Sequence, residues 1–330
     1  MTVPILEAAA LSKVFRVTRR GVLGDPDRLN RLWALRSVSI ALEEGETLGL
    51  VGESGCGKTT LGRCMVGLEE PSAGEILYRG APLAALDRIA RSRRIQMIFQ
   101  DPYASLNPRM TVRQALAELM TVHGLCRGRG ELADRIDRLL LRVGLPPAQK
   151  HELPHAFSGG QRQRISIARA LALEPEIIVA DEPVSSLDVS IQAQIINLFE
   201  QLREELGIAC VFISHDLNVV RHISRRIAVM YFGEIVELAE TELLFAAPAH
   251  PYTRALLSAI QEPDPEKRTR AASLEGEPPD PLAPPPGCGF SPRCPVALDA
   301  CRSTAPGLEA PAPGRLARCV RASELLDGAI

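Results

Sequence analysis

The sequence predicts an α/β fold built around a parallel β-sheet. Short apolar runs alternate with amphipathic stretches, and the run that ends at Val51 leads directly into a glycine-rich loop. Ile177–Ala180 and Ile208–Ile213 are two further buried runs, and the stretch between them repeats apolar residues at helical spacing until Gly207, which lies where a helix-ending glycine is expected. This strand–helix–strand unit favours parallel strands whose carboxyl ends carry the ligand site.

Length and composition limit the class of protein. A chain of 330 residues suffices for roughly two domains. The hydrophobic share of 46% and the charged share of 24% exclude a mainly disordered or fibrous chain, and the net charge of −2 disfavours a broadly basic nucleic-acid binder. No apolar run is long enough to span a bilayer, and the N-terminus lacks a secretory signal. We therefore expect a cytosolic chain whose eight cysteines form no disulfide framework.

Proline distribution divides the chain in two. Thirteen of the 26 prolines lie between Pro263 and Pro313, where we do not expect regular helix or sheet to persist. We therefore predict a main domain over 1–262 and a small Cys/Pro-rich C-terminal domain over 263–330. Within the main domain, residues from about 103 to 165 carry helical patterns and no strong strand, which indicates a helical insertion. The sequence assigns no role to the insertion around 21–31.

The glycine-rich loop matches G-x-x-x-x-G-K-[ST] and lies between a predicted strand and a predicted helix, which is the context of a phosphate-binding loop. Its glycines let backbone N–H groups surround phosphates, Lys58 adds a positive charge, and the Thr59 hydroxyl is a ligand for Mg²⁺. The predicted phosphate-binding residues here are Gly52, Glu53, Ser54, Gly55, Cys56, Gly57, Lys58, Thr59 and Thr60.

Two acids follow the second buried run. Asp181 ends a strand and is placed to hold Mg²⁺ with its water shell, and Glu182 is placed to polarise an attacking water. An exposed acidic turn is the alternative for the same pair, but buried acids without partners are costly, which favours the functional interpretation.

A third motif makes the chain resemble the ATP-binding-cassette (ABC) ATPases. Ser158, Gly159, Gly160 and Gln161 match the signature of that family and precede a helix-like run. The phosphate loop, signature, acidic pair, a D-loop (Ser186, Leu187, Asp188) and His215 occur in family order over about 200 residues. The resemblance implies a P-loop NTPase core with an antiparallel β-subdomain and a helical subdomain.

The same resemblance assigns further roles. Gln100 becomes the Q-loop glutamine, which contacts Mg²⁺ and takes part in catalysis with Glu182 and His215. The resemblance makes Phe15 the aromatic that stacks on adenine, and Trp33 is a nearby alternative for that role. The other interpretation of Phe15 is an ordinary aromatic of the hydrophobic core. In the family, the signature faces the γ-phosphate held by another subunit, so a lone chain lacks complete active sites.

Three longer segments, 99–109, 181–194 and 250–258, resemble the oligopeptide/dipeptide importer branch, and most of all its dipeptide F-type subunits. The resemblance implies an ATPase that energises import of di- or oligopeptides from the cytoplasmic face of the membrane. It also implies the partners, which are an identical or homologous ATPase subunit, two transmembrane permeases and an extracytoplasmic solute-binding protein. Nickel, glutathione or sugar is the alternative cargo. A non-transport ABC protein acting on nucleic acid or the ribosome is a remote alternative, disfavoured by the single cassette and the absence of sustained heptads.

The predicted C-terminal domain contains four thiols, those of Cys288, Cys294, Cys301 and Cys319. This proline-rich segment has little apolar material for a core of its own, and a cross-link could replace that core. Some members of the family branch are understood to hold a [4Fe–4S] cluster at this pattern. Four thiolates suit such a cluster or Zn²⁺, although the spacing matches neither the zinc C-x₂-C pair nor the bacterial ferredoxin run. Unligated thiols are the third alternative.

Overall fold

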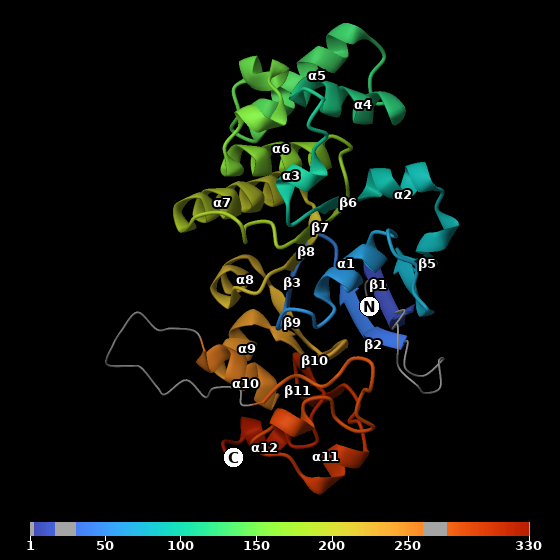
Figure 1. Ribbon diagram of the computed structural model, residues 1–330, viewed down its shortest axis with the longest axis vertical. Helices are drawn as coiled ribbons and strands as arrows, with labels where there is room; N and C mark the ends of the chain where they lie inside the picture. Colours follow the sequence, from blue (N-terminus) through green and yellow to red (C-terminus); the bar gives the residue numbers. More distant parts are fainter. Residues whose placement is uncertain (1–2, 17–30, 260–275, 330) are drawn as a thin grey trace, which may run out of the picture.

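Two sheets organise the computed structural model, which describes residues 3–16, 31–259 and 276–329 (Figure 1). Among these residues, one sheet has the strand order β11-β12-β10-β9-β3-β8-β7-β6, and the other has the order β2-β1-β4-β5. The strands are β1 (Leu6–Arg16), β2 (Arg31–Leu42), β3 (Thr47–Val51), β4 (Ala73–Tyr78), β5 (Ala81–Pro82), β6 (Ile95–Ile98), β7 (Ile177–Asp181), β8 (Ala209–Ile213), β9 (Arg226–Tyr231), β10 (Glu234–Glu240), β11 (Glu309–Ala312) and β12 (Arg315–Ala317).

Helices cover the larger sheet and fill the segment between β6 and β7. The α-helices are α1 (Lys58–Met65), α2 (Arg88–Arg94), α3 (Pro102–Ser105), α4 (Val112–Val122), α5 (Arg129–Arg142), α6 (Gly159–Leu171), α7 (Val189–Leu206), α8 (Leu217–Ile223), α9 (Thr241–Ala246), α10 (Pro251–Ser258), α11 (Asp299–Ser303) and α12 (Ala322–Leu326). The short 3-10 helices are η1 (Leu83–Ala85), η2 (Pro147–His151), η3 (Pro154–Ala156) and η5 (Ser291–Arg293).

The centre of the larger sheet is parallel, which confirms the α/β prediction. β3 pairs in parallel with β8 and β9, and β7 pairs in parallel with β6 and β8. Side chains of β7 alternate between two cores, since Ile178 belongs to the core on the α7 side and Ile177 to the core on the α1 side. The predicted strand–helix–strand unit is β7–α7–β8, and Gly207 ends α7 with a left-handed φ of 64°.

Helical and antiparallel parts flank this core. The stretch 99–176, all of it described, contains α3 to α6 and no strand, so the expected helical insertion lies at the top of Figure 1. The sheet β2-β1-β4-β5 is antiparallel and packs beside α1. Its β1–β2 register places Trp33 opposite Val14 and Leu32 opposite Phe15. This register brings both candidate adenine-stacking rings to one end of the same strand pair.

The C-terminal region differs from the expected small separate domain. β12 pairs antiparallel with β10, so the region extends the central sheet, and Phe290 is buried in the main core. A segment with few apolar residues cannot bury a core alone and packs on the larger one. The region also contains the short α11 and β11, contrary to the expectation of no regular structure. Pro311 is accommodated because β11 is an edge strand. The predicted boundary at 262/263 and residues 21–30 of the predicted insertion lie outside the described residues.

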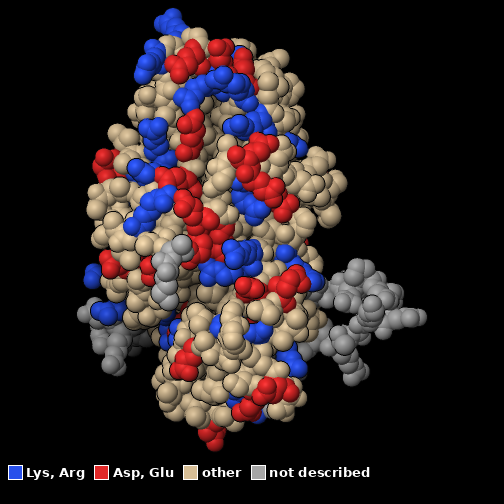
Figure 2. All heavy atoms as spheres, turned by 180° about the vertical axis from the view of Figure 1, so that it is seen from behind, with Lys and Arg blue, Asp and Glu red and all other residues tan. Residues whose placement is uncertain are grey.

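Charged side chains of both signs are interspersed on the face seen from behind (Figure 2). They are sparser over the lower part of that view, where the C-terminal region lies. Within the described ranges, no helix combines the length and the apolar character needed to cross a bilayer.

Candidate functional site

The glycine-rich loop connects β3 to the N-terminus of α1. Gly57 has a left-handed φ of 111°, and a Cβ at Gly52 would lie 2.1 Å from the carbonyl oxygen of Met230, so a larger residue at either position would strain the loop. Lys58 is buried, and its Nζ donates to the carbonyl oxygens of Gly52 at 2.7 Å and Glu53 at 3.0 Å. The loop therefore wraps around the lysine at a helix N-terminus, an arrangement suited to phosphate.

A hydroxyl and a carboxylate meet at the start of α1. The Thr59 hydroxyl donates to Asp181 Oδ1 at 3.0 Å, and Asp181 is buried at the end of β7. Burial raises the pKa of Asp181, the neighbouring charge of Glu182 adds to the rise, and the hydrogen bond from Thr59 opposes it. Thr59 and Asp181 offer only oxygen atoms as ligands, and the negative charge of the buried Asp181 is unfavourable without a cation. A hard divalent cation such as Mg²⁺ suits such a pair. Thr59 and Asp181 are thus the residues that could hold it.

Three side chains predicted to be catalytic converge beside this pair. Glu182 Oε2 accepts a hydrogen bond from Gln100 Nε2 at 3.0 Å and lies 3.2 Å from His215 Nδ1. Gln100 follows β6, Glu182 follows β7 and His215 follows β8, so the three come from the carboxyl ends of adjacent parallel strands. The Glu182 side chain is 18% exposed and that of His215 is 60% exposed, which leaves the group accessible from one side.

A cleft of about 600 Å³ joins the phosphate loop to these three residues. Its wall on the opposite side comes from the antiparallel sheet and contains both candidate aromatics, Phe15 and Trp33. The remaining lining residues are Leu32, Ala34, Ser54, Gly55, Gly57, Lys58, Thr59, Thr60, Gln100, Glu182, His215 and Pro281. Of the other predicted loop residues, Gly52 and Cys56 are buried, and burial raises the pKa of the Cys56 thiol.

The signature residues do not line this cleft. Ser158 caps α6, and its hydroxyl accepts from the Gln161 N–H at 3.3 Å while the Gln161 side chain accepts from the Ser158 N–H at 3.0 Å. A Cβ on Gly160 would lie 2.6 Å from Ile191 of α7, so only glycine lets the two helices approach this closely. Ser158 and Gly159 are exposed.

The predicted D-loop lies beside the signature. The Leu187 side chain would be 3.3 Å from a Cβ on Gly159, while Ser186 and Asp188 are exposed. Asp188 caps α7 by accepting from the Ile191 N–H at 3.0 Å. Signature and D-loop therefore form one continuous exposed surface outside the chain's own cleft.

The four C-terminal thiols are near one another but do not form a ligand set. Burial raises the pKa values of Cys288, Cys294 and Cys319, and the charges of neighbouring thiols in the group raise them further. Cys301 accepts a backbone hydrogen bond from the Cys288 N–H at 2.8 Å. Across the described ranges, no three His, Cys, Asp or Glu side chains are arranged to hold a metal ion. The expected [4Fe–4S] or Zn²⁺ site is not supported by this arrangement.

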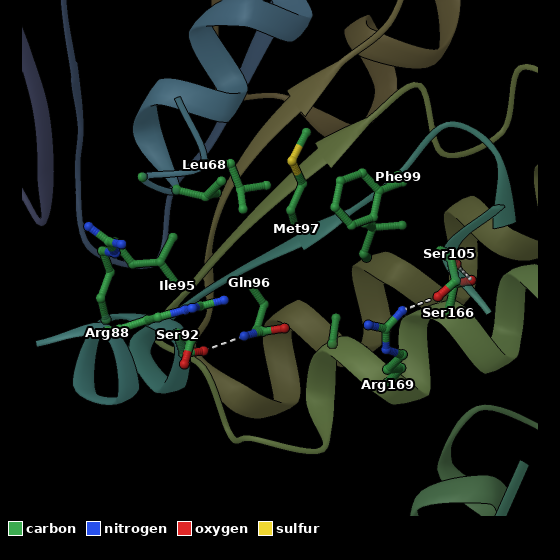
Figure 3. Close-up of a pocket in the computed structure, with 15 residues that line it drawn as sticks. Leu68, Arg88, Ser92, Ile95, Gln96, Met97, Phe99, Ser105, Ser166 and Arg169 are labelled. Carbon is green, nitrogen blue, oxygen red and sulfur yellow. Dashed lines mark hydrogen bonds between the residues drawn. The ribbon is translucent and has the colours of Figure 1, made fainter. Parts of the chain in front are cut away.

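A second cleft, of about 210 Å³, lies where the helical insertion meets the core (Figure 3). Strand β6 forms its floor, the exposed Leu68 lies at one side, and α6 supplies Ser166 and Arg169 at the other. Ser105 and Ser166 are hydrogen-bonded at 3.1 Å, and Arg169 donates to the Ser105 carbonyl. β6 ends two residues before Gln100, so this cleft and the first one share a strand.

Sequence reasoning missed two contributions to the site. Pro281 lines the first cleft, and its carbonyl accepts from the Trp33 N–H at 3.2 Å. Arg293 forms an ion pair with Glu53 at 2.8 Å, which brings the C-terminal region to the phosphate loop. Arg293 lies between Cys288 and Cys294 in the sequence, and nothing in that segment indicates a partner 240 residues away.

Comparisons with known proteins agree with these motifs. Residues 35–185 match the family described as "ABC transporter", and residues 236–301 match "Oligopeptide/dipeptide transporter, C-terminal region". The chain is 50% identical to YkfD of Bacillus subtilis, over 96% of this chain and 95% of that protein. It is 48% identical to "Oligopeptide transport ATP-binding protein AppF" of the same organism, over 96% of each chain.

A solved structure shares the fold. The dimeric ATP-binding cassette MJ0796 bound to ADP and Pi has a TM-score of 0.61 and 29% identity, covering 72% of this chain and 98% of that one.

Proposed function

Because the chain belongs to the ABC transporter family, among the ATP-binding subunits of its oligopeptide/dipeptide branch, we infer that it is an ATPase that energises peptide import. The observation that carries the catalytic assignment is the Glu182 carboxylate, held between Gln100 and His215 at the end of the cleft that contains Lys58. A carboxylate so placed can accept a proton from a water that attacks a terminal phosphate.

The remaining residues of the cleft bind and orient ATP. The loop backbone and Lys58 hold the phosphates, and Phe15 or Trp33 stacks on the base from the antiparallel sheet. Thr59 and Asp181, with Gln100 beside them, would hold Mg²⁺, which when bound neutralises charge on the phosphates. His215 orients the Glu182 carboxylate and can donate to the terminal phosphate.

We propose that a second ATPase subunit, identical or homologous, completes each site. Ser158 and Gly159 are exposed and lie apart from the chain's own cleft, and the neighbouring Val189 is 82% exposed. A helix N-terminus that offers N–H groups to solvent is a site for an anion from elsewhere, here the terminal phosphate bound by the partner subunit. The related cassette MJ0796 is itself dimeric.

The second cleft is our candidate for the contact with the permeases (Figure 3). Leu68 is 59% exposed at its side, and β6 connects its floor to Gln100. We propose that a cytoplasmic segment of a permease subunit inserts an apolar side chain here, so that movement of α6 is transmitted to the membrane. A photo-cross-linker at Leu68 should capture a permease in the assembled complex, whereas the same group at the exposed Leu298 should not. Equal capture at both positions would remove this assignment.

Two permeases and an extracytoplasmic solute-binding protein complete the proposed importer, with this chain on the cytoplasmic face of the membrane. Uptake of labelled di- and oligopeptides, with nickel alongside, tests the cargo in a host carrying the wild type or Glu182→Gln. Selective loss of peptide uptake supports the proposal. Selective loss of nickel uptake would keep the ATPase and replace the cargo.

The substitution Glu182→Gln tests the chemistry. It removes the proton acceptor but keeps the shape, so we expect ATP binding to persist while turnover in the assembled complex falls by about 100-fold or more. Glu204→Gln, at an exposed position on α7, is the matched control and should retain turnover. Unchanged hydrolysis in Glu182→Gln would defeat the assignment of the base.

The C-terminal thiols enter no step of this proposal, because they do not form a ligand set. A metal or [4Fe–4S] cluster on Cys288, Cys294, Cys301 and Cys319 stays a hypothesis supported by their proximity alone. Iron, sulfide and zinc analysis of anaerobically purified protein tests it. A stoichiometric content that Cys294→Ser abolishes would support the hypothesis, and its absence from the wild type would contradict it.

A further inference from the structure

The C-terminal region contacts the phosphate loop through an ion pair between Arg293 and Glu53. Arg293 Nη1 lies 2.8 Å from Glu53 Oε2, and Nη2 lies 3.1 Å from Glu53 Oε1, so the ion pair is bidentate. The Arg293 side chain is only 6% exposed and that of Glu53 is 29% exposed. A bidentate pair largely removed from water is among the stronger polar contacts in proteins and fixes orientation as well as position.

A buried aromatic cluster, formed by Tyr231, Tyr252 and Phe290, contacts this ion pair. The Tyr252 hydroxyl accepts from the Glu53 N–H at 2.9 Å, and the Tyr231 hydroxyl lies 3.4 Å from Arg293 Nη1. The rings of Tyr231 and Tyr252 pack on Phe290 of the C-terminal region, with centroids 5.3 Å and 5.5 Å away. Both the side chain and the backbone of Glu53 are therefore held by residues that lie far along the chain.

The negative charge of Glu53 gives this contact a consequence for phosphate binding. Glu53 is the second residue of a loop that has to receive polyanionic phosphates, and an unpaired carboxylate there would repel them. Arg293 neutralises the carboxylate and directs it toward the C-terminal region. The carbonyl of the same residue meanwhile accepts from Lys58 Nζ at 3.0 Å, so a shift of Glu53 would also move the lysine.

A second contact reaches the other end of the cleft. Pro281, which precedes Arg293 in the same region, lines the cleft and accepts the hydrogen bond from the Trp33 N–H. The C-terminal region thus touches the nucleotide site both at its phosphate loop and beside its aromatic wall.

We propose that Arg293 is a positioning residue for the phosphate loop, through which the C-terminal region sets the affinity of this ATPase for ATP. The inference rests on the proposed function, since it requires the cleft to bind ATP. It predicts that the cost of losing Arg293 comes from the charge of Glu53 and is relieved when that charge is also removed.

The test is a double-mutant cycle on the full-length chain, with Kd for Mg²⁺-ATP measured by displacement of a fluorescent ATP analogue. We expect Arg293→Gln to raise Kd by about tenfold, because the unpaired negative charge of Glu53 would then repel the phosphates. Arg293→Lys keeps the charge without the bidentate geometry, so its Kd should lie between those of the wild type and Arg293→Gln. Arg293→Gln combined with Glu53→Gln should bind more tightly than Arg293→Gln alone. Arg302→Gln, on the exposed face of α11, is the matched control.

Thermal unfolding and steady-state kinetics distinguish a positioning role of Arg293 from a purely structural role. Positioning raises KM for ATP in the assembled complex with little change in kcat, and the second substitution rescues KM. If Arg293→Gln binds ATP like the wild type, or if Glu53→Gln gives no rescue, the inference is overturned. Failure of the wild type itself to bind ATP would instead refute the proposed function.

Discussion

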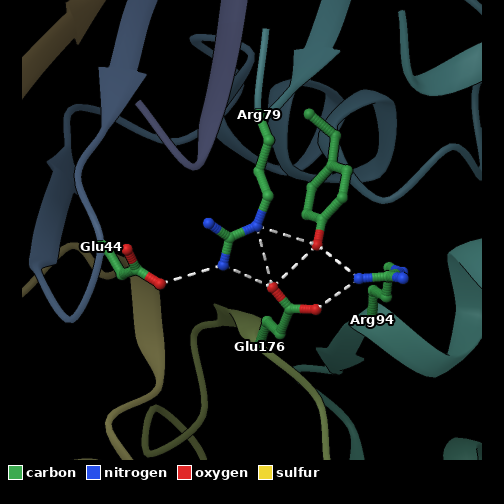
Figure 4. A network of polar contacts seen from close by, with 5 residues as sticks. Glu44, Arg79, Arg94 and Glu176 are labelled. Carbon is green, nitrogen blue, oxygen red and sulfur yellow. Dashed lines mark hydrogen bonds and ion pairs between the residues drawn. The ribbon is translucent and has the colours of Figure 1, made fainter. Parts of the chain in front are cut away.

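A polar network at the edge of the sheet opposite the nucleotide site offers a quantitative test of the fold (Figure 4). Glu176, just before β7, accepts hydrogen bonds from the Tyr78 hydroxyl at 2.7 Å, from Arg79 Nη2 at 2.8 Å and from Arg94 Nη1 at 2.6 Å. Arg79 also donates to Glu44 at 2.9 Å. One carboxylate thus joins the antiparallel sheet, the start of β6 and the start of β7.

The substitution Glu176→Gln removes the charge and leaves the shape. The side chain of Glu176 is 32% exposed and those of Arg79 and Arg94 are 46% and 44% exposed, so solvent screens each contact. At about 0.5 kcal/mol for each of three partially screened partners, we expect a loss of about 1.5 kcal/mol. For a chain of 330 residues such a loss lowers the midpoint of thermal unfolding by about 2 °C.

The effect of Glu176→Gln should depend on pH in a defined direction. Partial burial opposes ionisation of Glu176, but the hydrogen bonds from Arg79 and Tyr78 and the charges of Arg79 and Arg94 hold its pKa below the ordinary 4.5. A depressed pKa in the folded state stabilises the protein fully above the unfolded value, and that stabilisation is lost as pH falls through the folded value. The difference between wild type and variant should therefore be largest near neutral pH and shrink below about pH 4.5.

Thermal unfolding of the two proteins at several pH values measures this difference. Glu242→Gln is the matched control, because Glu242 forms a single exposed ion pair with Arg221 at 3.3 Å and its loss should change little. ATP affinity should be the same in all three proteins, since the network lies away from the cleft. A Glu176→Gln midpoint equal to that of the control at neutral pH, or a difference that grows on acidification, would refute the reasoning.

Two further predictions concern buried titratable groups. Burial lowers the pKa of His250 to about 3, so between that value and 6.5 only the unfolded chain takes up its proton, and stability falls on acidification by up to about 1.4 kcal/mol per pH unit. His250→Asn keeps an acceptor for the Tyr252 N–H and should flatten urea-unfolding stability between pH 6.5 and 5, whereas an unchanged slope would contradict the burial argument. Burial raises the pKa of Asp181, so its charged form costs stability at neutral pH. Asp181→Asn should raise the thermal midpoint without nucleotide while lowering Mg²⁺-dependent hydrolysis by about 100-fold or more, and a lower midpoint would refute this.

The sequence alone determined those parts of the site that depend on neighbours along the chain. The glycine positions of the phosphate loop follow from backbone conformations and close approaches that only glycine permits, as at Gly52 and Gly57. Glu182 and His215 could be assigned to one edge because each follows a buried run, and the carboxyl ends of parallel strands meet at the same edge. Periodicity likewise predicted β7, α7 and β8, with Gly207 at the helix end.

Only the tertiary structure decided which distant residues meet. The Gln100–Glu182 contact joins positions 82 residues apart, and the Arg293–Glu53 pair joins positions 240 residues apart. A lone arginine or glutamate carries no local signal of its partner, because ion pairs depend on packing and on nothing periodic in the chain. The proline distribution predicted a small C-terminal domain over 263–330 but carried no signal of where that domain attaches. Its lack of apolar residues is visible in the sequence, but the β10 edge that receives β12 is not.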